Sequence, residues 1–162
     1  MKIFVGKGRT FSSWLIRVVT KSPYTHCGLV FDDGVVLHST IGGCQHTDME
    51  YIKESYDLLT VYECKFPEAE PTARTVERDW LGAKYDYLSF IGLGLALLFG
   101  LKKNPLGQHE QLLCTEVPAH WLNKISAANP SYRLPYLDPE LVTPKEIYEL
   151  LEISDDLFEK VI

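Results

Sequence analysis

Four short apolar runs in the first 65 residues have the composition of β-strands. They are rich in Val, Leu, Phe, Thr and Tyr, and the residues between them include the Gly, Pro, Asp and Ser that favour turns. One segment between the first two runs instead has the three- and four-residue spacing of a short amphipathic helix. We therefore expect strands at residues 2–5, 25–31, 35–40 and 57–65, and a helix at residues 12–19.

The pattern changes to helical spacing after Pro67, where apolar residues recur every three or four positions. Thr143, followed by Pro144 and Glu146, is a typical helix start, with Thr as the N-cap and Pro in the first turn. We expect helices at residues 71–83, 86–101, 114–124 and 143–151. Strands that precede helices in this way predict an α+β fold with an antiparallel sheet.

The length and composition are typical of one globular domain, which we expect to cover residues 1–162. Hydrophobic residues make up 46% of the chain and charged residues 23%, and this length is enough to bury a core. The formal net charge of −6 argues against a general nucleic-acid binder, which would carry a basic surface. We therefore expect no nucleic-acid partner.

The cysteines and the N-terminus favour a reducing location. No apolar leader follows Met1, and the spacing of the cysteines suggests no disulfide framework. We expect reduced thiols and a cytoplasmic protein, with association with a virus particle as an open alternative. The four cysteines are Cys27, Cys44, Cys64 and Cys114.

A hairpin with two histidines is the first candidate for chemistry. A two-residue turn would place His26 and His38 on opposite faces of the sheet, because side chains alternate along a strand. A three-residue loop at residues 32–34 instead pairs Gly28 with His38 and puts both histidines on one face. Gly34 suits the left-handed position that ends such a loop. Taken singly, each histidine is more simply a partly buried core side chain.

Cys114 is the candidate nucleophile. Pro118 is tolerated only in the first turn of a helix, so the helix should begin near Cys114 or Thr115. A cysteine at a helix N-terminus favours the thiolate, and free N–H groups there can form an oxyanion hole. Against this interpretation, a free cysteine is more often a small buried hydrophobic residue.

Two further features have simpler interpretations. Cys44 and His46 are close in sequence, but the chain lacks the paired short spacings of zinc ligands, so we expect a loop there and no metal or other cofactor. Residues 87–101 form an uncharged, mostly apolar run that is too short to span a bilayer. We interpret this run as a buried core helix, and the alternative is a surface that contacts a membrane or another protein. Asp86 is expected to be its N-cap.

Together these motifs resemble the permuted papain-like cysteine hydrolases. The resemblance rests on His26 in THCGLVF, His38 in VLHS and Cys114 in LLCTEV, in the order His, His, Cys. The resemblance is to the YiiX/YaeF-type bacterial amidases of the NlpC superfamily and, more distantly, to the lecithin:retinol acyltransferases. Residues 82–100 and 143–149 are similar to the glycine-rich apolar helix and the closing helix of the bacterial branch.

The resemblance implies a fold and a reaction. The fold would be an antiparallel, barrel-like sheet packed with helices, and the reaction would cleave an amide, peptide or related acyl bond through a thioester. It assigns Cys114 as nucleophile, His26 as base and His38 as the residue that orients the base. Oxyanion or substrate-binding residues are expected at Tyr24, Thr115 and Glu116. A cell-wall peptide would be the favoured substrate, in a bacterial or phage setting.

Two alternatives differ in class from amide hydrolysis. The first is acyl transfer or ester cleavage on lipids, which the apolar run supports. The absence of the Asn-Cys-Glu-His signature of the acyltransferases opposes it, since Leu113 precedes Cys114 here. The second is a non-enzymatic virion component or interaction protein that retains the fold. The reactivity of the Cys114 thiol distinguishes this second alternative.

Overall fold

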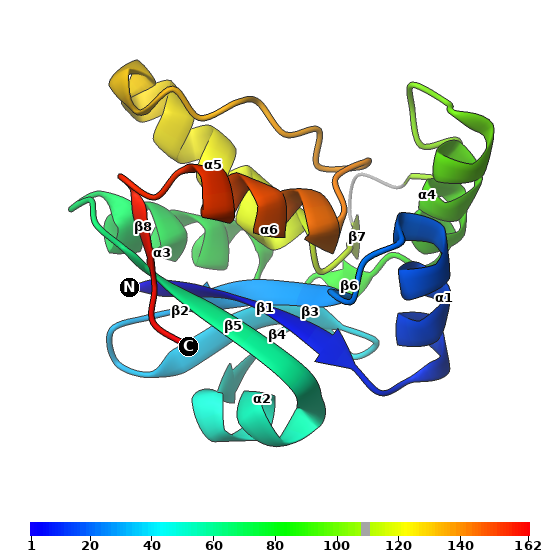
Figure 1. Cartoon of the computed structure of the whole chain (residues 1–162), viewed down its shortest axis with the longest axis horizontal. Helices are drawn as coiled ribbons and strands as arrows, with labels where there is room; N and C mark the ends of the chain where they lie inside the picture. The colour runs from blue at the N-terminus through cyan, green and yellow to red at the C-terminus, as the bar shows by residue number, and fades with distance from the viewer. Residues whose placement is uncertain (108–110) are drawn as a thin grey trace.

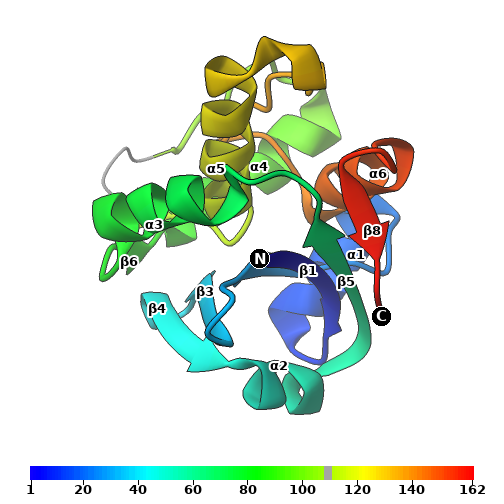
Figure 2. The ribbon, with the colours of Figure 1, turned by 90° about the vertical axis from the view of Figure 1, so that its left-hand side faces the viewer.

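The computed structural model describes residues 1–107 and 111–162 as one α+β unit (Figure 1). Six described strands form one antiparallel sheet in the order β4-β3-β2-β1-β5-β8. Figure 2 shows that this sheet is strongly curled, although β4 and β8 remain its two edges. Its strands are β1 (Lys2–Gly8), β2 (His26–Val30), β3 (Val35–Thr40), β4 (Gly43–Asp48), β5 (Tyr56–Cys64) and β8 (Phe158–Lys160).

Helices cover both faces of the sheet and one of its ends. In Figure 1, α3, α5 and α6 lie above the sheet, α2 lies below it, and α1 and α4 stand together at one side. A short parallel pair, β6 (Lys84–Tyr85) and β7 (Gln111–Leu112), precedes α4 and α5. The helices are α1 (Phe11–Thr20), α2 (Met49–Ser55), α3 (Ala69–Trp80), α4 (Tyr87–Phe99), α5 (Glu116–Ala128) and α6 (Pro144–Ile153), with a 3₁₀ turn at Pro130–Tyr132.

The alternation of side chains along the strands builds two cores. Odd-numbered residues such as Ile3, Val5 and Leu29 pack against α3, α5 and α6 in the larger core. Residues on the opposite face pack against α2, and this smaller cluster consists of Phe4, Val30, Val36, Val61 and, from α2 itself, Ile52. The sheet is therefore buried on both faces, which explains why several of its strands are nearly continuous apolar runs.

Most of the predicted elements are confirmed, with ends shifted by a few residues. The helix start at Thr143 is also confirmed, because Thr143 and Glu146 form a complete capping box. Asp86 caps α4, since its carboxylate accepts a hydrogen bond of 2.6 Å from the backbone N–H of Ser89. The loop expected around Cys44 and His46 is wrong, because these residues form β4 against β3.

The interpretation of residues 87–101 as a buried core helix is also wrong. Most large side chains of α4 are exposed, and its buried residues are Ser89, Gly92 and Ala96. No helix in the described residues is long and apolar enough to cross a membrane.

Candidate active site

The hairpin between β2 and β3 has the three-residue loop that places both histidines on one face. Leu29 pairs with Leu37 and Val30 with Val36, so residues 32–34 form the loop. Gly34 ends it with a φ of +86°, a conformation that glycine adopts without strain.

The two histidine side chains are hydrogen-bonded to each other. The Nε2 atom of His26 lies 3.0 Å from the Nδ1 atom of His38, and Tyr56 stacks on the His26 ring with centroids 5.3 Å apart. Burial, followed by the charge of His26, lowers the pKa of His38 to about 3, so His38 is neutral at physiological pH.

Neutral His38 carries one N–H, and its Nε2–H tautomer is the one that leaves Nδ1 of His26 able to accept a proton. The Nε2 atom of His38 lies 3.3 Å from Oγ1 of Thr47 and can donate its proton there. Its Nδ1 atom then accepts a hydrogen bond from Nε2–H of His26, which leaves Nδ1 of His26 as the basic nitrogen. The hydrogen bond to neutral His38 holds the His26 ring in one orientation, as a carboxylate does in a Ser-His-Asp triad.

The space between the histidines is filled rather than open. A Cβ atom on Gly28 would lie 2.7 Å from the Phe4 ring, 2.8 Å from the Leu37 carbonyl oxygen and 2.9 Å from Cβ of His38. Gly28 therefore lets Phe4 and His38 approach the backbone of β2 closely.

Cys114 lies immediately before the first turn of α5, as the position of Pro118 predicts. Thr115 is the N-cap, although its side chain does not cap the helix. The chain is held here by two bonds to Leu112, whose carbonyl accepts from the Ser39 hydroxyl at 2.9 Å and from the backbone N–H of Asp86 at 3.3 Å. The nucleophile candidate is therefore anchored to β3 and to the start of α4.

The environment of Cys114 favours its thiolate. A hydrogen bond from the Cys27 thiol and the charge and hydrogen bond of His26 hold the pKa of Cys114 well below its usual value, against the effect of burial. Because Nε2 of His26 is hydrogen-bonded to His38, we infer that Nδ1 is the His26 nitrogen that contacts the Cys114 thiol. The two histidines and Cys114 form a chain from Thr47 to the sulfur.

Cys27 is a site residue that the sequence interpretation missed. Its Sγ atom also lies 3.6 Å from the carbonyl oxygen of Cys114, and burial raises the pKa of Cys27 well above its usual value, so Cys27 remains a protonated donor. We predict that Cys27→Ala raises the pH at which Cys114 reacts with iodoacetamide by about one to two units, the effect of losing one hydrogen bond to a charge.

Cys27→Ser is the matched control for this prediction, because it keeps a donor at the same position. Its labelling profile should stay close to that of the wild type. Equal profiles for Cys27→Ala and the wild type would show that Cys27 does not activate Cys114.

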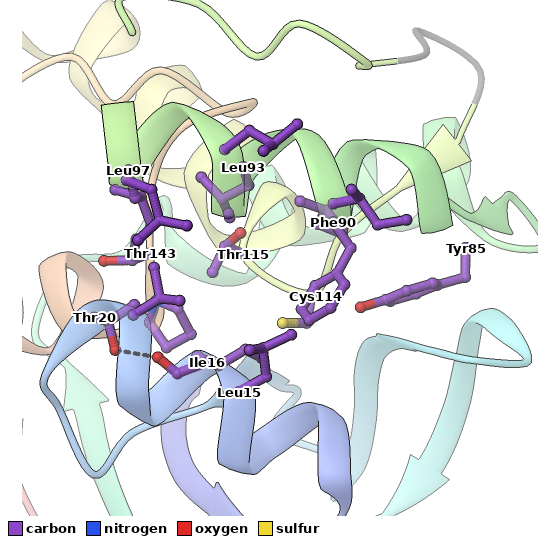
Figure 3. Close-up of a pocket in the computed structure, with 17 residues that line it drawn as sticks. Leu15, Ile16, Thr20, Tyr85, Phe90, Leu93, Leu97, Cys114, Thr115 and Thr143 are labelled. Atoms are coloured by element: carbon purple, nitrogen blue, oxygen red, sulfur yellow. Dashed lines mark hydrogen bonds between the residues drawn. The ribbon is translucent and has the colours of Figure 1, made fainter. Parts of the chain in front are cut away.

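The Cys114 sulfur faces an apolar cavity of about 220 Å³ between α1 and α4 (Figure 3). None of the described residues that line it is charged. The Thr20 hydroxyl is bonded to the Ile16 carbonyl, and the Thr143 hydroxyl belongs to the capping box of α6. The polar side chains left to meet a ligand are therefore Tyr85, Cys114 and Thr115.

Tyr85 and Thr115 lie on either side of the Cys114 sulfur. In Figure 3, the Tyr85 hydroxyl points toward Cys114 from β6, and Thr115 lies on the other side. Burial, followed by the charge of Cys114, raises the pKa of Tyr85, so the phenol stays protonated and can donate a hydrogen bond. The Thr115 hydroxyl is buried and has no hydrogen-bond partner in the described structure. The Tyr85 hydroxyl can donate to an oxygen bound beside Cys114, and the unpaired Thr115 hydroxyl can do so after rotation about its Cα–Cβ bond.

The other two predicted binding residues lie elsewhere. Tyr24 stacks on Tyr148 with ring centroids 4.2 Å apart, its hydroxyl lies 3.1 Å from Oγ1 of Thr60, and it does not line the cavity. The Glu116 backbone N–H donates to the Leu113 carbonyl, and its side chain borders a different cavity. Burial raises the pKa of the Glu116 carboxyl to about 8. Neither residue contacts the space beside Cys114.

Cys44 and His46 both lie on β4 but have different surroundings. Cys44 is buried in β4, and Nε2 of His46 lies 2.6 Å from a Glu77 carboxylate oxygen. Among the described residues, no three His, Cys, Asp or Glu side chains gather where they could hold an ion.

Comparison with known proteins supports the fold. No protein-family model and no curated protein matches the sequence. A crystal structure described as that of the metalloprotein yiiX from Escherichia coli O157:H7, DUF1105, is similar, with a TM-score of 0.57 and 17% sequence identity over 99% of this chain and 94% of that chain. At this identity the likeness shows the fold alone. The word metalloprotein in that description applies to the E. coli protein.

Proposed function

We propose that the protein is a cysteine hydrolase of the permuted papain-like type, which cleaves an ester or amide bond of an apolar acyl group through a thioester on Cys114. The observation that carries this proposal is the position of the activated thiol at an apolar cavity with two unused hydroxyl donors beside it. Ligand sites of this kind combine an apolar lining with a few convergent polar groups.

The first half of the reaction uses the histidine chain. Nδ1 of His26 takes the proton from Sγ of Cys114, and the thiolate attacks the carbonyl carbon of the substrate. The imidazolium that forms keeps its Nε2–H bonded to neutral His38. Hydrogen bonds from Tyr85 and Thr115 stabilise the negative charge that develops on the carbonyl oxygen.

The second half returns the enzyme to its starting state. His26 gives its Nδ1 proton to the leaving oxygen or nitrogen, and the acyl group remains as a thioester on Cys114. A water molecule then loses a proton to His26 and attacks the thioester carbonyl. The acid is released and the proton returns to the His26–Cys114 pair.

The cavity favours an acyl chain over the cell-wall peptide that the resemblance implies. A peptide needs partners for its amide groups, because an unpaired polar group in an apolar site is costly. The described lining offers only the hydroxyls nearest Cys114 for this purpose. An alkyl chain needs no such partners and gains from leaving water.

Gly94 provides a test of this substrate class. It lines the cavity, and a Cβ atom placed on it meets open space, so Gly94→Phe fills the cavity without a backbone clash. We predict that kcat/KM for nitrophenyl esters of long acyl chains falls about 10-fold or more in Gly94→Phe, whereas acetyl ester cleavage stays within about twofold.

Gly94→Ala is the control, since it removes the same glycine but leaves most of the cavity empty. It should resemble the wild type with every ester. An equal effect of Gly94→Phe on long and short esters would show that the cavity does not hold the acyl chain. Absence of cleavage with all esters and amides in the wild type would contradict the proposed function itself.

A further inference from the structure

Helix α4 buries its small residues and exposes most of its large apolar residues, which is the reverse of an ordinary surface helix. Its buried residues Ser89, Gly92 and Ala96 are small, and Asn104 packs against them. The Asn104 amide donates to the Ser89 carbonyl at 2.9 Å and to the Ser89 hydroxyl at 2.6 Å. A Cβ atom on Gly92 would lie only 1.9 Å from Oδ1 of Asn104. These contacts fix the orientation of α4 with its large side chains outward.

The outward face of α4 is an apolar stripe. Leu88, Ile91, Leu95 and Leu98 recur at helical spacing and are between 37% and 68% exposed. Phe99 extends the stripe and is 73% exposed. A surface helix normally directs such residues at the core.

Helix α1 supplies a second stripe next to the first. Phe11, Trp14, Leu15 and Val18 are all exposed and fall on one side of the helix. α1 packs beside α4, as Figure 1 shows. The two stripes form one surface, which we call the α1–α4 face. Exposed apolar surfaces of this kind mark interaction sites.

The cavity of Cys114 opens onto the α1–α4 face. Leu15 of α1 and Ile91, Leu95 and Leu98 of α4 line the cavity and are also exposed at the surface. Figure 3 shows the lining side chains between the two helices, with the Cys114 sulfur among them. A ligand that lies on this face can therefore enter the cavity directly.

The charge around this face differs from that of the whole chain. Residues 10–21 and 87–103 contain Arg17, Lys21, Lys102 and Lys103 and no Asp or Glu, although the chain has 22 acidic and 16 basic residues. An apolar face bordered by cations complements a lipid surface that carries negative headgroups. A second copy of this acidic chain would be repelled by the like charges elsewhere on its surface.

We propose that the α1–α4 face docks on the surface of an anionic lipid bilayer. The helices lie in the interface, because α4 has 13 residues and a spanning helix needs about 20. The apolar side chains enter the acyl region, with Trp14 and Tyr87 at the headgroup level. Lys21, Lys102 and Lys103 contact the phosphates. Docking goes beyond the proposed function, since binding requires no turnover.

Vesicle binding by the Cys114→Ala protein tests this inference without catalysis. We expect flotation with vesicles of phosphatidylcholine and phosphatidylglycerol, and several-fold weaker binding to phosphatidylcholine alone or at high salt. Phe99→Asp should abolish binding. The combined Lys102→Glu and Lys103→Glu change should weaken it by at least about fivefold for each cation removed.

The same types of substitution at surface positions away from the α1–α4 face serve as controls. Ile153 on α6 is 78% exposed and Lys145 is half-buried with its ammonium paired to Glu149, so Ile153→Asp and Lys145→Glu should bind as the parent protein does. No binding to anionic vesicles, or equal loss with Ile153→Asp, would overturn the inference. So would a dimer in light scattering that Phe99→Asp dissociates, because a second copy would then cover the face. None of these outcomes bears on the reactivity of Cys114, which is measured separately.

Discussion

Cys114→Ala is expected to reduce kcat for acyl ester cleavage by at least about 10⁴-fold, the scale seen when a covalent nucleophile is removed. The reason is that no other thiol faces the cavity among the described residues that line it. The fold should survive, because the change removes one buried sulfur. Initial rates of the wild type and variant, with the thermal midpoint of each, check this expectation.

Cys64→Ala is the matched control for the nucleophile. Cys64 is a free cysteine in β5, and burial raises its pKa to about 12, so it has no thiolate at neutral pH. This variant should keep the wild-type rate. Residual activity in Cys114→Ala above one hundredth of the wild-type rate would be incompatible with a thioester at Cys114.

His26→Ala is expected to reduce kcat/KM by about 10²- to 10⁴-fold, the usual contribution of a general acid–base. The variant loses both the proton acceptor of Cys114 and the donor to the leaving group. His38→Gln should have a smaller effect, since an amide can still accept from Nε2 of His26. The pH profiles of kcat/KM for the three proteins check this order.

His46→Gln serves as the control, because His46 pairs with Glu77 on the surface of β4 and α3. It should behave as the wild type at every pH. If His38→Gln were as inactive as His26→Ala, an amide would not replace His38, and the smaller contribution expected of His38 would be wrong.

The sequence was sufficient for the parts of the site that follow from local geometry. The hairpin register could be counted, because side chains alternate along strands and Gly34 suits a three-residue loop. The position of Cys114 at a helix start followed from Pro118, which has no N–H to donate. These two local arguments predicted that His26 and His38 share a face and that Cys114 precedes α5.

Other parts of the site depend on long-range packing and left no local signal. Cys27 meets Cys114 across 87 positions of sequence, and Tyr56 reaches His26 from β5. Tyr85 directly precedes Asp86, whose capping role is local and can be predicted from the sequence. Tyr85 itself reaches the cavity through the pairing of β6 with β7, which has no local signal.

The two wrong predictions have clear physical reasons. β4 contains Gln45, His46, Thr47 and Asp48, which read as a loop because the outer part of this edge strand is solvated. Helix α4 is apolar on nearly every side, so the sequence alone does not show which of its faces is buried. The contacts of Asn104 with Ser89 and Gly92 determine which face is buried.

An activated Cys114–His26 pair is tested by the pH dependence of iodoacetamide labelling, with the labelled site identified by peptide mass. We predict fast labelling of Cys114 below about pH 7, which is absent in Cys114→Ala and slower in His26→Ala at the same pH. Slow labelling of Cys114 that rises only near the pH of an ordinary thiol, about 8.5, would contradict an activated Cys114–His26 pair.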